Sequence, residues 1–210
     1  MNLSETSLTA VVHKQLTQSV TTLQAVLADA SIANTLARLA ELTATSMKAG
    51  GKLLVAGNGG SAADAQHLVA EFVSRLTVNR PALRAIALTT DTSILTAIGN
   101  DYTFDNIFSR QIEAIGAPGD VFLGISTSGN SKNILTALHQ ARQQGLTTVG
   151  FTGNGGGQMA QLCDLNIIIP STVTMNIQES HLALEHIFCM LVELCYFGPD
   201  LGSKPHHPAQ

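Results

Sequence analysis

His67 and Glu71 lie four residues apart in a segment whose apolar residues recur at helical spacing. Side chains four residues apart share one face of a helix, so these two can point at a common centre. An imidazole nitrogen and a carboxylate oxygen are both ligands that zinc accepts. The same spacing also occurs in ordinary surface hydrogen bonds, so the pair alone leaves both interpretations open.

A second group of polar side chains lies in the last segment with helical periodicity, residues 177–197. Its members are Gln178, Glu179, His181, Glu185 and His186. Ideal helix geometry places Gln178 closer to His181 and Glu185 than to His186. One group early in the chain and one late favour a metal site that both helices build.

Four hydroxyl side chains surround one predicted helix start, at residues 126–131. They are Ser126, Thr127, Ser128 and Ser131. The amino end of a helix presents unpaired N–H groups and the positive end of the helix dipole, and hydroxyl groups add further donors. A helix cap needs one hydroxyl, so four of them favour a phosphate-binding loop, which we call the hydroxyl loop. The helix that follows is predicted over residues 132–144.

A glycine-rich loop, residues 57–61, contains Asn58, Gly59 and Gly60 and precedes the segment with His67. Glycine lets the main chain approach a ligand without a Cβ atom in the way. Ser61 and Asp64 have the spacing of a capping box, so Ser61 either caps the helix or contacts a ligand. Neither loop has the spacing of a Walker A motif or a dinucleotide fingerprint. A third glycine-rich run, residues 152–157, is predicted to be a mobile connector.

Short apolar runs that alternate with helical segments must position these loops. The predicted strands are 52–56, 84–88, 120–125, 147–151 and 165–169. This alternation predicts an α/β fold with a mainly parallel sheet, helices on both faces and right-handed crossovers. In such sheets ligands bind at the carboxyl ends of the strands, where both polar loops fall.

The same periodicity predicts how the chain is divided. We expect one domain over residues 1–198, with helices at 1–48, an α/β core at 52–170 and a last helix at 177–197. Residues 199–210 contain several proline and glycine residues and are predicted to be a flexible tail.

The composition is unusually apolar, with 45% hydrophobic and 12% charged residues, which predicts surface buried between subunits. A net charge of -4 gives no reason to expect nucleic acid as a partner. Arg75, Arg80 and Arg84 are spread out and are predicted to be solvated or interface arginines.

The three cysteines form no CxxC pair and are predicted to be reduced core thiols. No signal peptide and no uninterrupted apolar stretch of membrane-spanning length is evident. We therefore expect a cytoplasmic protein with no membrane contact.

Several separated segments carry a family resemblance in order and spacing: GNGGSAADAQH, AIGND, ISTSGNS and GFTGN. Over residues 50–197 the chain resembles the sugar isomerase (SIS) fold and, more narrowly, the bacterial phosphoheptose isomerases. The resemblance implies a flavodoxin-like three-layer parallel sheet with extra terminal helices. It also implies a homotetramer with active sites at the subunit interfaces.

The resemblance further implies one Zn²⁺ per subunit, bound by His67, Glu71, Gln178 and His186. We follow it for His186 because Gln178 is expected near the helix start, where helix geometry is least regular. His181 is then either structural or a support for the ligands.

The implied reaction converts D-sedoheptulose 7-phosphate to D-glycero-D-manno-heptose 7-phosphate through a metal-stabilised enediol. In the resembling family this is the first step toward ADP-heptose and the lipopolysaccharide core. Glu71 would be the base and His186 its acid/base partner. The hydroxyl loop would bind the phosphate, and the sugar would contact Asn58, Gly59, Gly60, Glu71, Asn100, Asp101 and Gln178. Asp101 is equally a candidate turn residue.

Two other protein classes share the SIS fold. One is a relative that binds the replication initiator without catalysis, and it lacks a carboxylate four residues after the histidine; Glu71 therefore favours the enzyme. The other is the sugar-phosphate-sensing regulator, which carries a separate DNA-binding domain. Residues 1–49 show neither a basic recognition helix nor room for such a domain.

Overall fold

A single five-stranded parallel sheet forms the centre of the computed structural model, which describes residues 5–199. The strands are β1 (Leu53–Gly57), β2 (Ala85–Ala87), β3 (Val121–Ser126), β4 (Thr147–Thr152) and β5 (Leu165–Ile168). Their order is β2-β1-β3-β4-β5, and every pairing is parallel. This is the doubly wound, flavodoxin-like order that the resemblance implied, and each predicted strand is confirmed to within one residue at either end.

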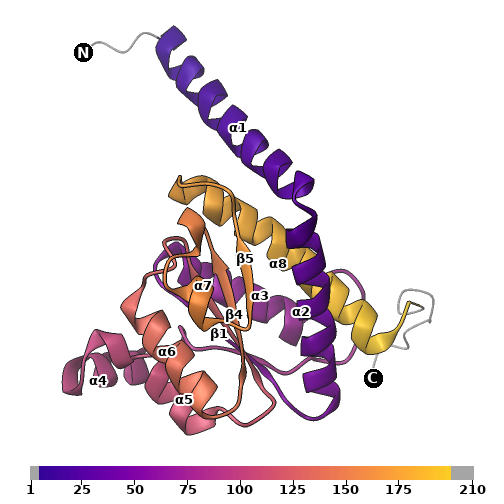
Figure 1. Cartoon of the computed structure of the whole chain (residues 1–210), viewed down its shortest axis with the longest axis vertical. Coiled ribbons are helices and arrows are strands. Elements are labelled where there is room, and N and C mark those ends of the chain that lie inside the picture. Colours follow the sequence, from indigo (N-terminus) through magenta and orange to yellow (C-terminus); the bar gives the residue numbers. More distant parts are fainter. Residues whose placement is uncertain (1–4, 200–210) are drawn as a thin grey trace.

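Helices cover both faces of the sheet (Figure 1) because strand residues alternate between the two faces. Leu53 and Val55 pack with the helices α2 (Ala30–Lys48), α3 (Gly60–Val73) and α8 (Thr174–Phe197). Leu54 and Ala56 pack with the opposite layer. That layer consists of α4 (Thr92–Asp101), α5 (Ser109–Ile115), α6 (Lys132–Gln143), α7 (Met159–Leu162) and the 3₁₀ turn η1 (Phe104–Asn106).

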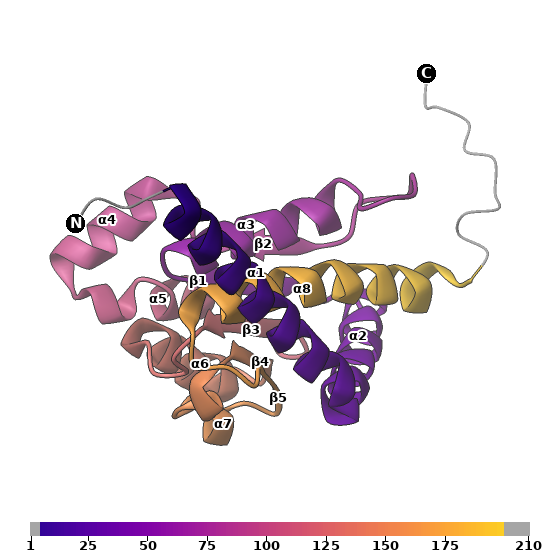
Figure 2. The ribbon, with the colours of Figure 1, turned by 90° about the horizontal axis from the view of Figure 1, so that it is seen from above.

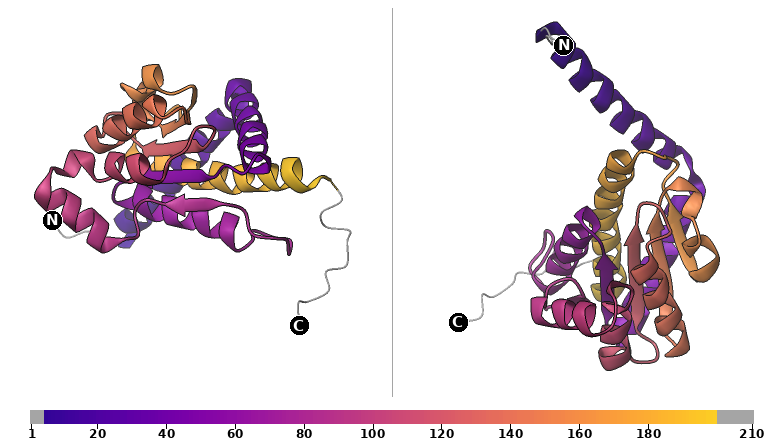
Figure 3. Two further views of the ribbon diagram at one scale, coloured as in Figure 1. Left: turned by 90° about the horizontal axis from the view of Figure 1, so that it is seen from below. Right: turned by 90° about the vertical axis from the view of Figure 1, so that its left-hand side faces the viewer.

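The first helix, α1 (Glu5–Ala28), extends beyond the sheet and its covering helices (Figures 1 and 3). It contacts α2 and α8, and Figure 2 shows it crossing over α8. Its apolar side chains remain exposed: Leu8, Val11, Val12, Leu16 and Val20. The two predicted amino-terminal helices are thus present, but this chain does not cover the apolar side of the first.

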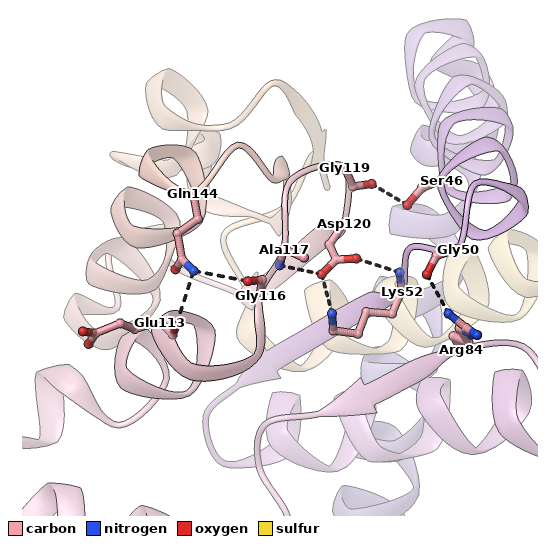
Figure 4. A network of polar contacts seen from close by, with 10 residues as sticks. All are labelled: Ser46, Gly50, Lys52, Arg84, Glu113, Gly116, Ala117, Gly119, Asp120 and Gln144. Carbon is pink, nitrogen blue, oxygen red and sulfur yellow. Dashed lines mark hydrogen bonds and ion pairs between the residues drawn. The ribbon is translucent and has the colours of Figure 1, made fainter.

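A polar network around Asp120 ties β1 and β3 together at their amino ends (Figure 4). The Asp120 side chain is buried and pairs with Lys52 Nζ at 2.6 Å. It also accepts hydrogen bonds from the main-chain N–H groups of Lys52 at 2.9 Å and Ala117 at 2.8 Å. The two strands that lead to the polar loops therefore start from a fixed register.

Helix α8 begins at Thr174, three residues before the predicted start. Gln178 therefore lies in the second turn, so the reason given for irregular geometry at Gln178 is wrong. By length and composition α8 is the one helix among residues 5–199 that is apolar enough to cross a membrane, although polar residues interrupt it. It packs against α2 and α3, as the core helix of a globular domain does. The predicted tail falls, from residue 200 on, outside the described residues.

The cysteines are free thiols, as predicted. Cys189 is buried, whereas Cys163 and Cys195 are half-buried. Burial raises the pKa of Cys163 and of Cys189 to about 12, so neither thiol ionises at neutral pH.

Candidate active site

His67, Glu71 and His186 meet where α3 and α8 pack against each other. The Nε2 atoms of His67 and His186 lie 2.8 Å apart, and His67 Nε2 lies 3.7 Å from Glu71 Oε1. One ligand atom from each of the three residues lies within 4.8 Å of the others. We call these three residues the histidine-carboxylate cluster. The contact between Phe72 and Phe188, with ring centroids 5.5 Å apart, holds the two helices together beside it.

The cluster has the donor chemistry of a catalytic zinc site. Tetrahedral zinc with bonds of 2.0–2.1 Å separates its ligand atoms by about 3.3 Å. The separations of 2.8 Å between the two Nε2 atoms and 3.7 Å between His67 Nε2 and Glu71 Oε1 bracket that value, and the donors of His186 and Glu71 lie within 4.8 Å of each other. Two imidazoles and a carboxylate are donors that catalytic zinc sites use, although other divalent cations accept the same donors.

Gln178 lies over the first turn of α3. Its Nε2 donates a hydrogen bond of 3.4 Å to Asp64 Oδ1, and its amide occupies the space that a Cβ atom on Gly60 would need. Asp64 lies one turn before His67, and burial raises the pKa of its carboxyl group. From the sequence we predicted for Asp64 only the role of capping partner to Ser61. Its spacing of three from His67 and seven from Glu71 was the signal that could have found it.

The capping-box prediction for Ser61 is wrong. Helix α3 begins at Gly60, its cap residue is Gly59 with φ of 57°, and no side chain caps it. Ser61 is buried within the first turn. A Cβ atom on Gly59 would meet nothing within 4 Å, so the main chain there is open on one side. The uncapped start of α3 and this open glycine leave N–H groups for a ligand.

The hydroxyl loop follows β3 and gathers its side chains in front of α6. The Oγ atoms of Ser126 and Ser131 lie 2.8 Å apart, and those of Ser126 and Ser128 lie 3.4 Å apart. Ser131 is the cap residue of α6, but its hydroxyl makes no capping hydrogen bond. The N–H groups of the first turn and the hydroxyls can therefore both donate to an anion.

The third glycine-rich run is not a mobile connector. Residues 153–157, which include the 3₁₀ turn η2 (Asn154–Gly156), pack directly on the hydroxyl loop. Gly153 N and Asn154 Nδ2 both donate to the Thr127 carbonyl, at 3.2 and 3.1 Å. Gly129 has φ of 65°, and a Cβ atom there would collide with the main chain of Gly156. The run therefore supports the hydroxyl loop, and the main chains of Gly129 and Gly156 can lie this close because neither residue has a side chain.

Two asparagines connect the loops after β1 and β3. Each of Asn58 and Asn133 donates its amide to the oxygen of the other, at 2.8 Å in both directions. The strands β1 and β3 are neighbours whose following helices, α3 and α6, leave to opposite faces. This is the topological switch point at which open α/β sheets bind ligands. The sequence missed Asn133, whose only signal was its place in the first turn after the hydroxyl loop.

Asn100 and Asp101 form the last residues of α4, so the prediction of Asp101 as a turn residue is wrong. Both are exposed, and Asn100 Nδ2 donates to Asp101 Oδ1 at 2.8 Å. Among residues 5–199, no hydrogen bond or ion pair joins them to the histidine-carboxylate cluster or to the hydroxyl loop.

His181 and Glu185 are buried and are not part of the cluster. His181 Nε2 lies 3.1 Å from the Thr152 carbonyl, and burial lowers the pKa of His181 to about 4. Burial, and secondly the charge of Asp64, raise the pKa of Glu185 to about 8. Both side chains are therefore neutral at pH 7. The turn of α8 that buries them rotates the next residue, His186, toward α3.

Comparison with known proteins is consistent across the chain. The SIS domain description matches residues 16–153. A protein of Burkholderia pseudomallei (strain K96243) named phosphoheptose isomerase is 58% identical over 174 residues, which cover 83% of this chain and 88% of the relative. A phosphoheptose isomerase of Aneurinibacillus thermoaerophilus is 50% identical over 89% of this chain and 94% of its own length. The solved phosphoheptose isomerase of Neisseria gonorrhoeae superposes with a TM-score of 0.83 at 40% identity, covering 89% of this chain and 98% of that one.

Proposed function

Since the chain belongs to the phosphoheptose isomerases of the SIS-domain family and is an isomerase, we propose that it converts D-sedoheptulose 7-phosphate to D-glycero-D-manno-heptose 7-phosphate. The observation that carries this proposal is the histidine-carboxylate cluster of His67, Glu71 and His186. Its helix α3 follows β1, and the hydroxyl loop follows the neighbouring strand β3. An aldose–ketose interconversion needs proton transfer next to a carbonyl, and a sugar phosphate substrate also needs a binding site for its phosphate group. The two polar regions supply these two functions.

In the proposed mechanism, Glu71 removes the proton from the carbon next to the carbonyl, and an enediol results. His186 donates a proton to the carbonyl oxygen as the enediol forms. It then takes the proton from the hydroxyl on the neighbouring carbon, and Glu71 returns its proton to the former carbonyl carbon, which completes the isomerisation. A divalent cation, when bound, supplies positive charge that stabilises the negative charge developing beside the reacting carbonyl. The closeness of Glu71 and His186 within one cluster supports their joint role.

The proposed metal ligands are His67, Glu71, Gln178 and His186, with one Zn²⁺ per subunit. The cluster supports three of them by geometry, and Gln178 is included because the family resemblance implies it; its amide lies over the first turn of α3. Glu71 then has two duties, as ligand and as base, which are compatible if its carboxylate leaves the cation during proton transfer.

The phosphate is proposed to bind to Ser126, Thr127, Ser128, Ser131 and the amides at the start of α6. The sugar is proposed to contact Asn58, Gly59, Gly60, Glu71, Asn100, Asp101 and Gln178. The reciprocal bond between Asn58 and Asn133 supports this arrangement because it places the sugar loop directly beside the phosphate loop. His181 is assigned a structural role, since its ring is buried against Phe151.

We also propose that the protein assembles as a homotetramer with active sites at the subunit interfaces. The exposed apolar side of α1 supports this, as does an apolar groove of about 440 Å³ between α1, α2 and α8. Among the described residues Asn100 and Asp101 make no hydrogen bond or ion pair with the cluster, so we assign them to the active site of a neighbouring subunit. A cytoplasmic enzyme that supplies heptose phosphate for lipopolysaccharide precursors is the corresponding cellular role.

The test is isomerisation of sedoheptulose 7-phosphate by the purified protein, with and without a chelator. We expect heptose 7-phosphate to form, turnover to stop on complete metal removal and to return when zinc is added. Glu71→Gln should abolish turnover with zinc supplied. If the unmodified protein forms no heptose product, the initiator-binding alternative gains, and chelator-resistant turnover would contradict the role of the metal.

A further inference from the structure

Arg80 is buried, contrary to the prediction that it would be a solvated or interface arginine. Its side chain is fully enclosed, and its Nε donates to Glu193 Oε1 of α8 at 2.7 Å. Its Nη2 donates to the Glu71 carbonyl and its Nη1 to the Phe72 carbonyl, both at 2.7 Å. One guanidinium therefore contacts the main chain of the proposed base and the helix that carries His186.

These contacts complete the carboxyl end of α3. The last carbonyls of a helix have no donor within the helix, and α3 has no basic residue in its last turn. Arg80 supplies the missing donors from a segment outside the helix, and it also reaches the carbonyls of Pro81 at 3.1 Å and Ser74 at 3.4 Å. The main chain at Glu71 is thereby fixed from beyond the end of its own helix.

The partner carboxylate, Glu193, lies seven residues after His186, which is two turns further along the same side of α8. Between these turns Phe188 packs on Phe72 of α3. The ion pair thus sets how far α3 and α8 are shifted along each other, and that shift decides where His67 and Glu71 meet His186.

We propose that Arg80, oriented by Glu193, is a positioning residue for the histidine-carboxylate cluster. It fixes the main chain of Glu71 and the register of α3 against α8, and so sets the spacing of the metal ligands. This inference rests on the proposed function in assigning metal binding and proton transfer to the cluster. Arginine is required because its planar fork reaches a carboxylate and several carbonyls at once, which a lysine cannot do.

A stability role alone makes a different prediction. A buried ion pair contributes little net stability compared with apolar side chains of similar volume, so such a replacement keeps a protein folded. The apolar replacement would lack every hydrogen bond to the end of α3. Folding and positioning can therefore be separated by experiment.

The first variant is Arg80→Lys, measured by zinc titration calorimetry, by thermal unfolding and by kcat and KM. We expect zinc affinity and kcat each to fall by about 10- to 100-fold, as for other residues that orient metal ligands, with a smaller change in KM. The matched control is Arg84→Lys. Arg84 also donates to a main-chain carbonyl, that of Gly50 at 2.7 Å, but on a different loop, so its substitution should leave zinc affinity unchanged.

The second variant combines Arg80→Met with Glu193→Leu. We expect it to fold cooperatively and yet keep the weakened zinc affinity and the reduced kcat. Wild-type zinc affinity in either variant, or loss of folding in both, would overturn the proposal because the pair would then serve stability alone. Zinc affinity is measured without substrate, so a failure of the proposed sugar reaction in the unmodified protein is distinguished from a failure of this inference.

Discussion

The Nε2 atoms of His67 and His186 lie 2.8 Å apart although 119 positions separate the two residues in the chain. At this distance one imidazole donates a proton to the other. A cation between them needs a lone pair from both nitrogens, so metal binding must replace this hydrogen bond and move its proton to the Nδ1 atom of the same ring.

Substituting His67→Ala should weaken zinc binding by more than about 100-fold, because it removes a direct ligand where even residues that orient ligands cost 10- to 100-fold. Calorimetry on the metal-free protein measures this loss. His139→Ala is the control, since His139 is exposed on α6, outside the cluster. Equal zinc affinity in the His67 variant and the control would remove His67 from the ligand set.

Substituting Ser128→Ala should raise KM by about 10-fold or more and change kcat little, because a hydrogen bond to a charged group contributes about 1.5–3 kcal/mol. Steady-state kinetics with the sugar phosphate measures this effect. Thr136→Ala is a control, since its hydroxyl bonds only to the Lys132 carbonyl of its own helix. Inorganic phosphate should inhibit the Ser128 variant less than it inhibits the unmodified enzyme; equal inhibition would count against phosphate binding at the hydroxyl loop.

Substituting Gly129→Ala should destabilise the protein by about 3 kcal/mol, because the added Cβ atom collides with the main chain of Gly156 and the positive φ adds strain. Gly119→Ala is the matched control, with φ of 88° but open space around the added atom. It should cost only about 1–2 kcal/mol, the strain of the left-handed conformation. Urea unfolding compares the two. Similar losses in both variants would show that the contact between Gly129 and Gly156 can relax.

The buried His181 predicts a specific pH dependence of stability. Its pKa is about 4 in the folded protein against an ordinary value of 6.5, so the unfolded chain binds the extra proton between these values. Folding stability should therefore fall as the pH decreases from about 6.5 to 4. His181→Gln should reduce this loss, by up to about 3 kcal/mol. Urea unfolding of the metal-free proteins at pH 7 and pH 4.5 measures the difference; parallel pH profiles would contradict it.

The fold was predictable because its signals are local. Each strand is a short apolar run such as residues 52–56, and each is separated from the next by helical spacing. What composition did not reveal was the burial of a charged side chain. Nothing in the residues next to Arg80 in the chain indicates that its side chain is buried. Its burial is explained by the carbonyls at the end of α3 and by Glu193 of α8, which is distant in the chain.

The site was predictable in part. Spacing of four predicted that His67 and Glu71 would share a face, and the structure places them so. Spacing could not choose His186 over His181 and Glu185, because that choice depends on which side of α8 faces the sheet. The resemblance supplied it. The third glycine-rich run was misjudged because glycine also allows two backbones to pack closely, and that use leaves no trace in a single segment.

The two halves of the proposed site stand on opposite faces of one sheet, with α6 behind the hydroxyl loop and α3 behind the cluster. A ligand that touches both must pass over the carboxyl ends of β1 and β3. The two strands pair along five residues, and Asp120 joins them at their amino ends. The distance between the two halves of the proposed site is therefore set by the pairing of β1 and β3. We therefore expect the length of a sugar phosphate that is anchored by its phosphate to decide whether its carbonyl reaches His186.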